Sequence, residues 1–253
     1  MEQQKTDKTT EIFRDAPIPK AVFTNIIPSV VSMIMVLVYN LADTFFIGQT
    51  HNAYMVAAVS LATPVFFMFM AIGMLFGIGG TSLISRMLGE GKPEKAKHAS
   101  SFCFWTGLAI GLLSMIFILL AGGFIANTIG ASEDTFEYVR QYLFVIAFGV
   151  PFLIISNAFS NIIRAEGMAG KAMMGMILGN VTNIILDPIM ILGFGWNVVG
   201  AAVATVIGTI VSAVYYIYHF ASGKSMLSIK PADYYAGAGI ATGVFAIGIP
   251  ASF

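Results

Sequence analysis

Six stretches of predominantly apolar residues divide the chain, and each is long enough to cross a bilayer as a helix of about 20 residues. They lie at 20–48, 55–85, 98–126, 136–161, 168–193 and 198–221. The first is longer than a span requires and contains Pro28, so we expect it to be tilted or kinked. After the polar stretch 222–235, a seventh apolar segment runs from 236 to 253. This pattern predicts an all-α membrane protein, a six-transmembrane-helix bundle followed by the start of helix seven.

The composition supports the same class of protein. Hydrophobic residues make up 57% of the chain, charged residues only 10%, and the mean hydropathy is +0.84; a soluble domain has roughly 25% charged residues. The single Cys103 excludes an intramolecular disulfide and a cysteine-based metal cluster. The net charge is zero, and no nucleic-acid motif, phosphate-binding loop, zinc motif or nucleophile elbow occurs. We therefore expect a membrane protein that is not an enzyme and has no nucleic-acid partner.

The basic residues predict the orientation of the bundle. Twelve of the thirteen Lys and Arg residues precede the first span, follow the sixth, or lie between spans two and three or four and five. Arg140 is the one exception. Because Lys and Arg concentrate in cytoplasmic loops, the N-terminus is expected to be cytoplasmic. Residues 1–19 then form a cytoplasmic segment, and 222–235 a cytoplasmic linker.

Two carboxylates sit well inside apolar spans, Asp43 in the first and Asp187 in the fifth. An ionised carboxylate at membrane depth is costly unless it meets a cation, a proton or water. Asn183 lies four residues before Asp187 and so shares its helix face, and Asn180 lies one turn further back. Pro188 lacks an N–H and frees a carbonyl in the preceding turn. Hard oxygen ligands of this kind suit Na⁺, and a carboxylate can instead take up a proton.

Other polar residues in the spans are expected to line one cavity with these carboxylates. Tyr39 and Asn40 precede Asp43 by one turn, and either could hydrogen-bond its carboxylate. The fourth and sixth spans contribute further amides and hydroxyls, namely Ser156, Asn157, Ser160, Asn161, Thr205 and Thr209. The alternative for any single hydroxyl is a bond back to its own helix, and for an Asn a bond between helices. As a set, they predict a polar cavity between helices one, four, five and six, with Tyr39, Asn40, Asn161 and Asn180 as secondary lining.

The segment Arg164-Ala-Glu-Gly167 lies at the cytoplasmic end of the fourth span. Its composition is typical of an interfacial loop, in which the basic residue meets lipid headgroups and Gly ends the helix. We favour this role as a loop, and the alternative is a role in gating.

At these residues the sequence resembles the multidrug and toxic compound extrusion (MATE) transporters, from about Pro28 to the C-terminus. The ordered motifs that carry the resemblance are Asn40-Leu-Ala-Asp-Thr-Phe-Phe-Ile-Gly48, Ala57-Ala-Val-Ser-Leu-Ala-Thr-Pro64, Arg164-Ala-Glu-Gly167, Asn183-Ile-Ile-Leu-Asp-Pro188 and Gly200-Ala-Ala-Val-Ala-Thr205. The resemblance implies two six-helix lobes that face a central cavity and alternate in access. The chain would then hold the N-lobe, 20–221, the inter-lobe linker, 222–235, and the start of a truncated second lobe, 236–253. Transporters are often built from internal repeats, and Gly248-Ile-Pro-Ala-Ser252 echoes Ile26-Ile-Pro-Ser29.

The family branches with a carboxylate-based cation site imply a set of coupling residues. The matching positions here are Asp43, Asn157, Asn183, Asp187 and Thr205. Na⁺ would be held by Asp43, Asn183 and Asp187, or a proton would be exchanged there. No cofactor other than this coupling ion is expected.

The implied function is secondary active multidrug efflux at the cell membrane, in which organic cations or other toxic compounds leave in exchange for Na⁺ or H⁺. Its partners would be a small-molecule drug, the lipid bilayer and the C-terminal lobe of the same protein. Two alternatives stay open. One is a lipid-linked oligosaccharide flippase of the same superfamily, whose cavity should be richer in Arg and Lys. The other is a half-length protein that works as a homodimer.

Overall fold

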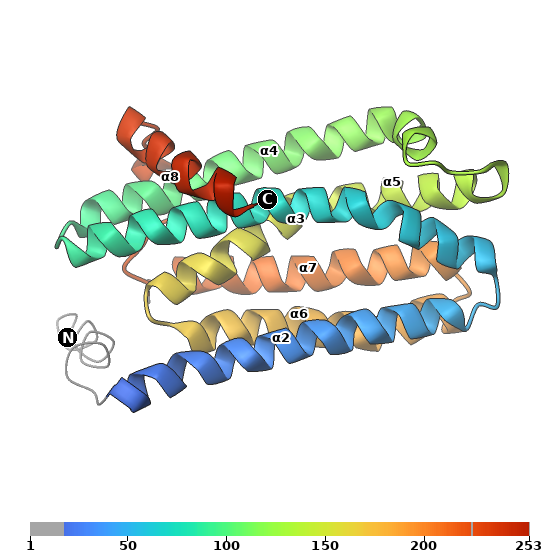
Figure 1. Cartoon of the computed structure of the whole chain (residues 1–253), viewed down its shortest axis with the longest axis horizontal. Helices are drawn as coiled ribbons and strands as arrows, with labels where there is room; N and C mark the ends of the chain where they lie inside the picture. The colour runs from blue at the N-terminus through green and yellow to red at the C-terminus, as the bar shows by residue number, and fades with distance from the viewer. Residues whose placement is uncertain (1–17, 224, 253) are drawn as a thin grey trace.

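The computed structural model describes residues 18–223 and 225–252, and within them the secondary structure is entirely helical. The long helices lie side by side along one axis and are joined by short turns, whereas a longer segment leads to the last helix, which lies obliquely to the others (Figure 1). In chain order they are α2 (Ile18–Gly48), α3 (Ala53–Gly89), α4 (Pro93–Thr128), α5 (Glu133–Ala165), α6 (Ala169–Asp187), the π-helical turn η1 (Pro188–Gly193), α7 (Asn197–Ala221), the 3₁₀ turn η2 (Pro231–Asp233) and α8 (Ala238–Ala251).

The six predicted spans are confirmed as six helical segments long and apolar enough to cross a membrane. They cover Ile26–Gly48, Ala53–Gly89, Pro93–Thr128, Glu133–Ala165, Ala169–Gly193 and Asn197–Ala221. The shorter apolar helix Gly239–Ala251 begins the predicted seventh. The predicted N-terminal segment 1–19 lies almost wholly outside the described residues. The protein is therefore a multi-pass membrane protein.

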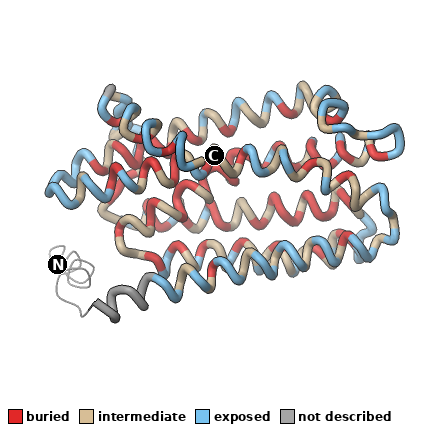
Figure 2. Tube along the Cα trace, viewed as in Figure 1, coloured by how far each residue is buried: buried red, intermediate tan, exposed pale blue. Residues whose placement is uncertain are grey.

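Helix α5 forms the centre of the bundle. In its most apolar stretch of 18 residues, 72% of the residues are buried, against 11% in the corresponding stretches of α2 and α4. Helix α5 packs against α3, α4 and α7. Figure 2 shows the buried residues concentrated on the inner helices. Small residues permit the close packing: a Cβ added at Gly111 of α4 would lie only 2.6 Å from Pro151 Cα of α5.

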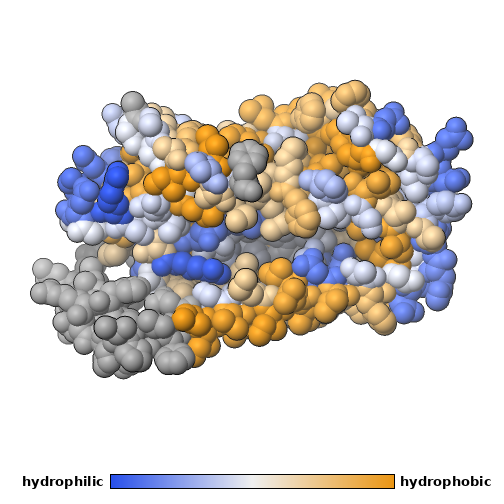
Figure 3. All heavy atoms as spheres, viewed as in Figure 1, coloured by the Kyte–Doolittle hydropathy of each residue, from blue (hydrophilic) through white to orange (hydrophobic). Residues whose placement is uncertain are grey.

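Apolar side chains cover the outside of the bundle between its two ends. Leu37 and Leu41 of α2 are 63% and 71% exposed, and Leu120 of α4 is 83% exposed. In the face shown in Figure 3, orange apolar atoms cover much of the two flanks between the ends, and hydrophilic atoms gather at the ends and along the hollow between the flanks. Such a belt is costly in water and is typical of a surface covered by lipid.

The candidate coupling site

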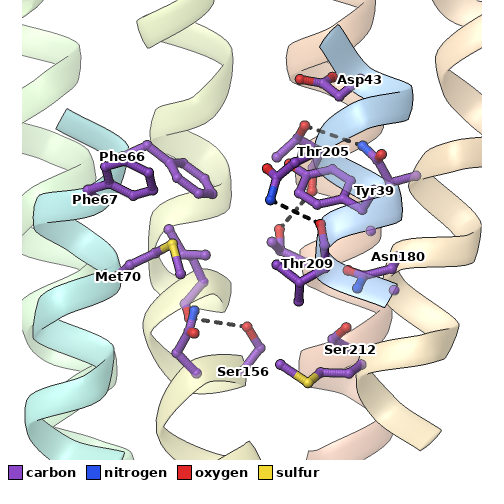
Figure 4. A pocket seen from close by; sticks show the side chains of 18 of the residues that line it. Tyr39, Asp43, Phe66, Phe67, Met70, Ser156, Asn180, Thr205, Thr209 and Ser212 are labelled. Carbon is purple, nitrogen blue, oxygen red and sulfur yellow. Dashed lines mark hydrogen bonds between the residues drawn. The ribbon is translucent and has the colours of Figure 1, made fainter. Parts of the chain in front are cut away.

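A cavity of about 270 Å³ lies among α2, α3, α5, α6 and α7. Its polar lining residues are Tyr39, Asn40, Asp43, Thr63, Tyr142, Ser156, Asn157, Ser160, Asn180, Asn183, Thr205, Thr209, Ser212 and Tyr216. Figure 4 shows Phe66, Phe67 and Met70 of α3 opposite the polar wall formed by α2, α6 and α7. The cavity therefore combines one polar wall with one apolar wall.

Close packing of α6 on α7 sets the polar wall. A Cβ added at Gly208 would lie 2.8 Å from the carbonyl oxygen of Gly179 and 3.1 Å from Asn183 Cβ, so these helices touch through backbone. At this crossing, Asn183 Nδ2 donates to Thr205 Oγ1 over 3.3 Å. Both side chains are buried, with 2% and 6% exposure. The bond turns the Asn183 amide, and the buried Asn183 Oδ1 accepts no hydrogen bond from the described residues.

Asp187 is the most deeply buried acidic side chain of the site, with no exposed surface. Neither of its carboxylate oxygens accepts a hydrogen bond from the residues that the structure describes. It lies one helical turn beyond Asn183, where α6 ends, and Pro188 begins the π-helical turn η1. A proline cannot donate to the preceding turn, which explains the change of helix type here. Asp187 itself is not among the residues that line the cavity.

Asp43 of α2 lines the cavity. Its Oδ1 atom is buried and, within residues 18–223 and 225–252, accepts no hydrogen bond. Helix α2, which carries Asp43, packs against α6, which ends at the buried Asp187. Two helices thus bring two acidic groups to one buried region, as their placement in apolar spans suggested.

Of the other side-chain amides predicted for the site, those of Asn40, Asn157 and Asn180 line the cavity and that of Asn161 does not. Nδ2 of Asn157 donates to Leu153 O at 2.9 Å, and Nδ2 of Asn40 donates to Val36 O at 3.0 Å, each within its own helix. Both residues line the cavity, as does Asn180. Asn161 Nδ2 also bonds within α5, and Asn161 packs against Gly77 of α3 rather than lining the cavity. Tyr39 lines the cavity and lies beside Thr205 (Figure 4).

Several lining residues escaped the sequence interpretation. Tyr142 and Thr63 have no signal beyond being polar residues in apolar spans. Ser212 and Tyr216 do have one, because with Thr205 and Thr209 they form an i, i+4, i+7, i+11 stripe on α7. Their hydroxyls donate to the carbonyl oxygens of Gly175 and Ala172, at 2.9 and 2.7 Å, and join α7 to α6.

The unpartnered oxygens of the site fit a small cation or a proton. Buried acceptors without donors are costly, and here they belong to Asp43, Asn183 and Asp187. Among the described residues no cluster of three or more His, Cys, Asp or Glu side chains could hold a metal ion. A cation at this place would therefore be held by a mixed set of carboxylate, amide and hydroxyl oxygens, which is a hard ligand set.

Comparison with known proteins identifies close relatives. The Multidrug export protein MepA of Staphylococcus aureus (strain NCTC 8325 / PS 47) is 34% identical over 245 residues, which are 97% of this chain and 54% of that protein. The protein of the same name from Staphylococcus saprophyticus is 32% identical over the same extent. The chain spans about half the length of these curated relatives.

Solved structures match at the level of the whole fold. A crystal structure of MATE in complex with MaD3S superposes with a TM-score of 0.90 at 30% identity, covering 97% of this chain and 55% of that one. A MOP superfamily transporter from Pyrococcus furiosus Vc1 superposes with a TM-score of 0.89 at 30% identity, covering 97% and 54%. The MatE family model matches residues 28–189. This match covers more than half of the chain. The chain therefore belongs to the MatE family, the multidrug and toxic compound extrusion transporters.

Proposed function

We propose that this chain is the cation-coupled lobe of a secondary active efflux antiporter, which exports organic cations or other toxic compounds in exchange for Na⁺ or H⁺. The observation that carries the proposal is the group of buried, unpartnered oxygens on Asp43, Asn183 and Asp187. A carboxylate inside a membrane costs about 3 kcal/mol on insertion scales. A cation or proton bound there offsets that cost, and its exchange can drive transport.

The second part of the proposal is the substrate class. Phe66, Phe67 and Met70 give the cavity an apolar wall opposite its carboxylate. Aromatic and thioether side chains adapt to apolar ligands of differing shape, and aromatic faces attract cations. The relatives named as multidrug export proteins support the same class. We propose that the protein lies in the cell membrane with its N-terminus on the cytoplasmic side, and that a second lobe completes the cavity.

The cavity favours drug export over the oligosaccharide flippase. A site for pyrophosphate needs Arg or Lys, because phosphate groups are bound by basic side chains. Among the described residues, no Lys or Arg lines this cavity. The homodimer alternative is tested by reconstitution of the chain alone in vesicles with an imposed gradient.

The experiment measures efflux of a fluorescent organic cation from proteoliposomes that contain the protein bearing this chain, with an imposed Na⁺ or pH gradient. Asp43→Asn and Asp187→Asn are each expected to abolish the gradient-driven component, because each removes a negative charge from the site. Asp134→Asn is the matched control, since Asp134 is exposed at the start of α5. Near-normal gradient-driven efflux in both cavity variants would contradict the assignment of the site.

A further inference from the structure

The segment between α7 and α8 is held along the N-terminal part of α4. Trp105 Nε1 donates to the carbonyl oxygen of Ile229 at 3.1 Å, and Ser101 Oγ donates to that of Lys230 at 2.8 Å. His98 Nδ1 lies 2.8 Å from the carbonyl oxygen of Asp233. Positions 98, 101 and 105 share one helix face, so α4 presents a row of ring nitrogens and a hydroxyl group to the carbonyl oxygens of residues 229, 230 and 233. We call residues 225–235 the linker strap.

A buried carboxylate holds the other end of the linker strap. Glu166, which caps the C-terminus of α5, is only 3% exposed. Its Oε1 atom accepts hydrogen bonds from Ser225 Oγ at 2.6 Å, Met226 N at 2.8 Å and Leu227 N at 3.3 Å. The prediction that Arg164-Ala-Glu-Gly167 is only an interfacial loop therefore missed the main contact of Glu166. No local pattern signals it, because the partners lie about sixty residues away.

Backbone packing carries the attachment on into α8. A Cβ at Gly79 of α3 would clash with the carbonyl of Val244, and one at Gly248 of α8 with the carbonyl of Leu75. The two helices therefore touch without intervening side chains. The ring of Phe245 packs edge-on against Phe76, with centroids 5.9 Å apart. The linker strap and α8 are thus both attached to the first six helices, α8 through α3 and the strap through α4 and Glu166.

We propose that Glu166 is a positioning residue that clamps the linker strap to the six-helix lobe, so that α8 moves with this lobe as one body. The consequence for transport rests on the proposed function. If two lobes rock against each other, the linker strap cannot be the hinge, and the change of angle must occur beyond the start of α8. The clamp itself can be tested without transport.

Hydrogen exchange of the amides of Met226 and Leu227, in the protein bearing this chain in lipid nanodiscs, tests the clamp. Glu166→Ala removes the acceptor, so exchange of these amides should become roughly 2- to 10-fold faster, the range expected when an ordinary hydrogen bond is lost. Glu166→Gln keeps an acceptor oxygen and should restore most of the protection. The matched control is Glu90→Ala, because Glu90 likewise caps a span, α3, but its side chain is exposed and pairs with Arg86 and Lys92.

Two results would overturn the proposal. One is equal exchange of Met226 and Leu227 in Glu166→Ala and Glu90→Ala. The other is faster exchange spread over α5 and α7, which would indicate general loss of folding. Should Glu166→Ala not fold, Ser225→Ala removes one donor to Oε1 while keeping the carboxylate, and faster exchange confined to the linker strap is again expected. Protein that exchanges as expected but does not export would leave the clamp standing and contradict only the proposed function.

The transport readout separates positioning from binding. Glu166→Ala should lower the maximal efflux rate while leaving the apparent affinity for drug and cation unchanged, because Glu166 does not line the cavity. Glu166→Gln should recover the rate. A changed cation affinity in Glu166→Ala would contradict the positioning role.

Discussion

Thr205 lies where α6 meets α7, and its hydroxyl accepts the hydrogen bond that turns the Asn183 amide. Thr205→Val keeps the shape of the side chain and removes the acceptor. We expect roughly 10- to 100-fold weaker Na⁺ affinity, the usual effect of losing a group that orients a ligand. Thr209→Val is the control, because the Thr209 hydroxyl bonds only to carbonyls of its own helix, those of Thr205 and Val206. Equal Na⁺ affinity in the two variants, measured by calorimetry, would argue against Asn183 as a ligand.

Glu166 allows a pH prediction at the same scale. Burial raises the pKa of its carboxyl above the ordinary value of 4.5, and the hydrogen bonds from Ser225, Met226 and Leu227 only partly offset that rise. The docked state therefore favours the protonated form. Its extra stability is complete below the ordinary pKa and is lost as the pH rises through the raised one.

The measurement is hydrogen exchange of the linker strap from mildly acidic to neutral pH, corrected for the intrinsic rate. Protection of Met226 and Leu227 should fall as the pH rises in the wild type. It should be independent of pH in Glu166→Gln, which cannot titrate. The same fall in Glu166→Gln would show that another group controls the docking.

At the element scale, the contact between α6 and α7 depends on two glycines, Gly179 and Gly208. Gly208→Ala would place a methyl group 2.8 Å from the Gly179 carbonyl oxygen and 3.1 Å from Asn183 Cβ. We expect a loss of about 1–3 kcal/mol in stability from overpacking, together with weaker Na⁺ binding because Asn183 shifts. Gly122→Ala is the control, since its Cβ would meet no atom within 4 Å. Thermal unfolding and calorimetry of both variants check the result; unchanged Na⁺ binding in Gly208→Ala would mean that this crossing does not position the site.

The elements were the part of the structure that sequence predicted best. A membrane span must be apolar along its whole length and satisfy its own backbone hydrogen bonds, so hydropathy alone reveals it. The spacing of Asn183 and Asp187 likewise predicted a shared helix face. What spacing could not show is which of the two lines the cavity: Asn183 does, whereas Asp187 is not among the lining residues. That depends on how α6 is rotated against α7, which Gly179 and Gly208 set through a contact between helices.

Long-range contacts explain the rest of what sequence did not reveal. The hydrogen bonds of Glu166 to residues 225–227 join segments with no common pattern, and the row of polar groups on α4 is interrupted by apolar residues. In the sequence, a Glu two residues after an Arg is typical of an exposed loop, although Glu166 is buried in the structure. Only the fold brings its partners to it.

At the scale of the whole molecule, the described helices form a packed lobe whose cavity is bounded by five of its own helices. Relatives are about twice as long. Alternating access requires a second body to rock against the first around the site. The cation ligands proposed here, by contrast, all come from this chain. Binding and transport should therefore separate when the chain is studied alone.

We predict that the 253-residue chain, purified by itself, inserts and folds and binds the coupling ion but does not export. Its helices satisfy their own backbone groups and pack through small residues, so folding does not need a second lobe. Reconstitution in vesicles with an imposed gradient is the measurement, with full-length MepA of Staphylococcus aureus as the positive control for the assay. Na⁺ binding without efflux is the expected result, and Asp43→Asn should abolish that binding. Efflux by the isolated chain, dependent on Asp43, would instead favour a homodimer in which two copies face each other, because the second body would then be another copy of this lobe.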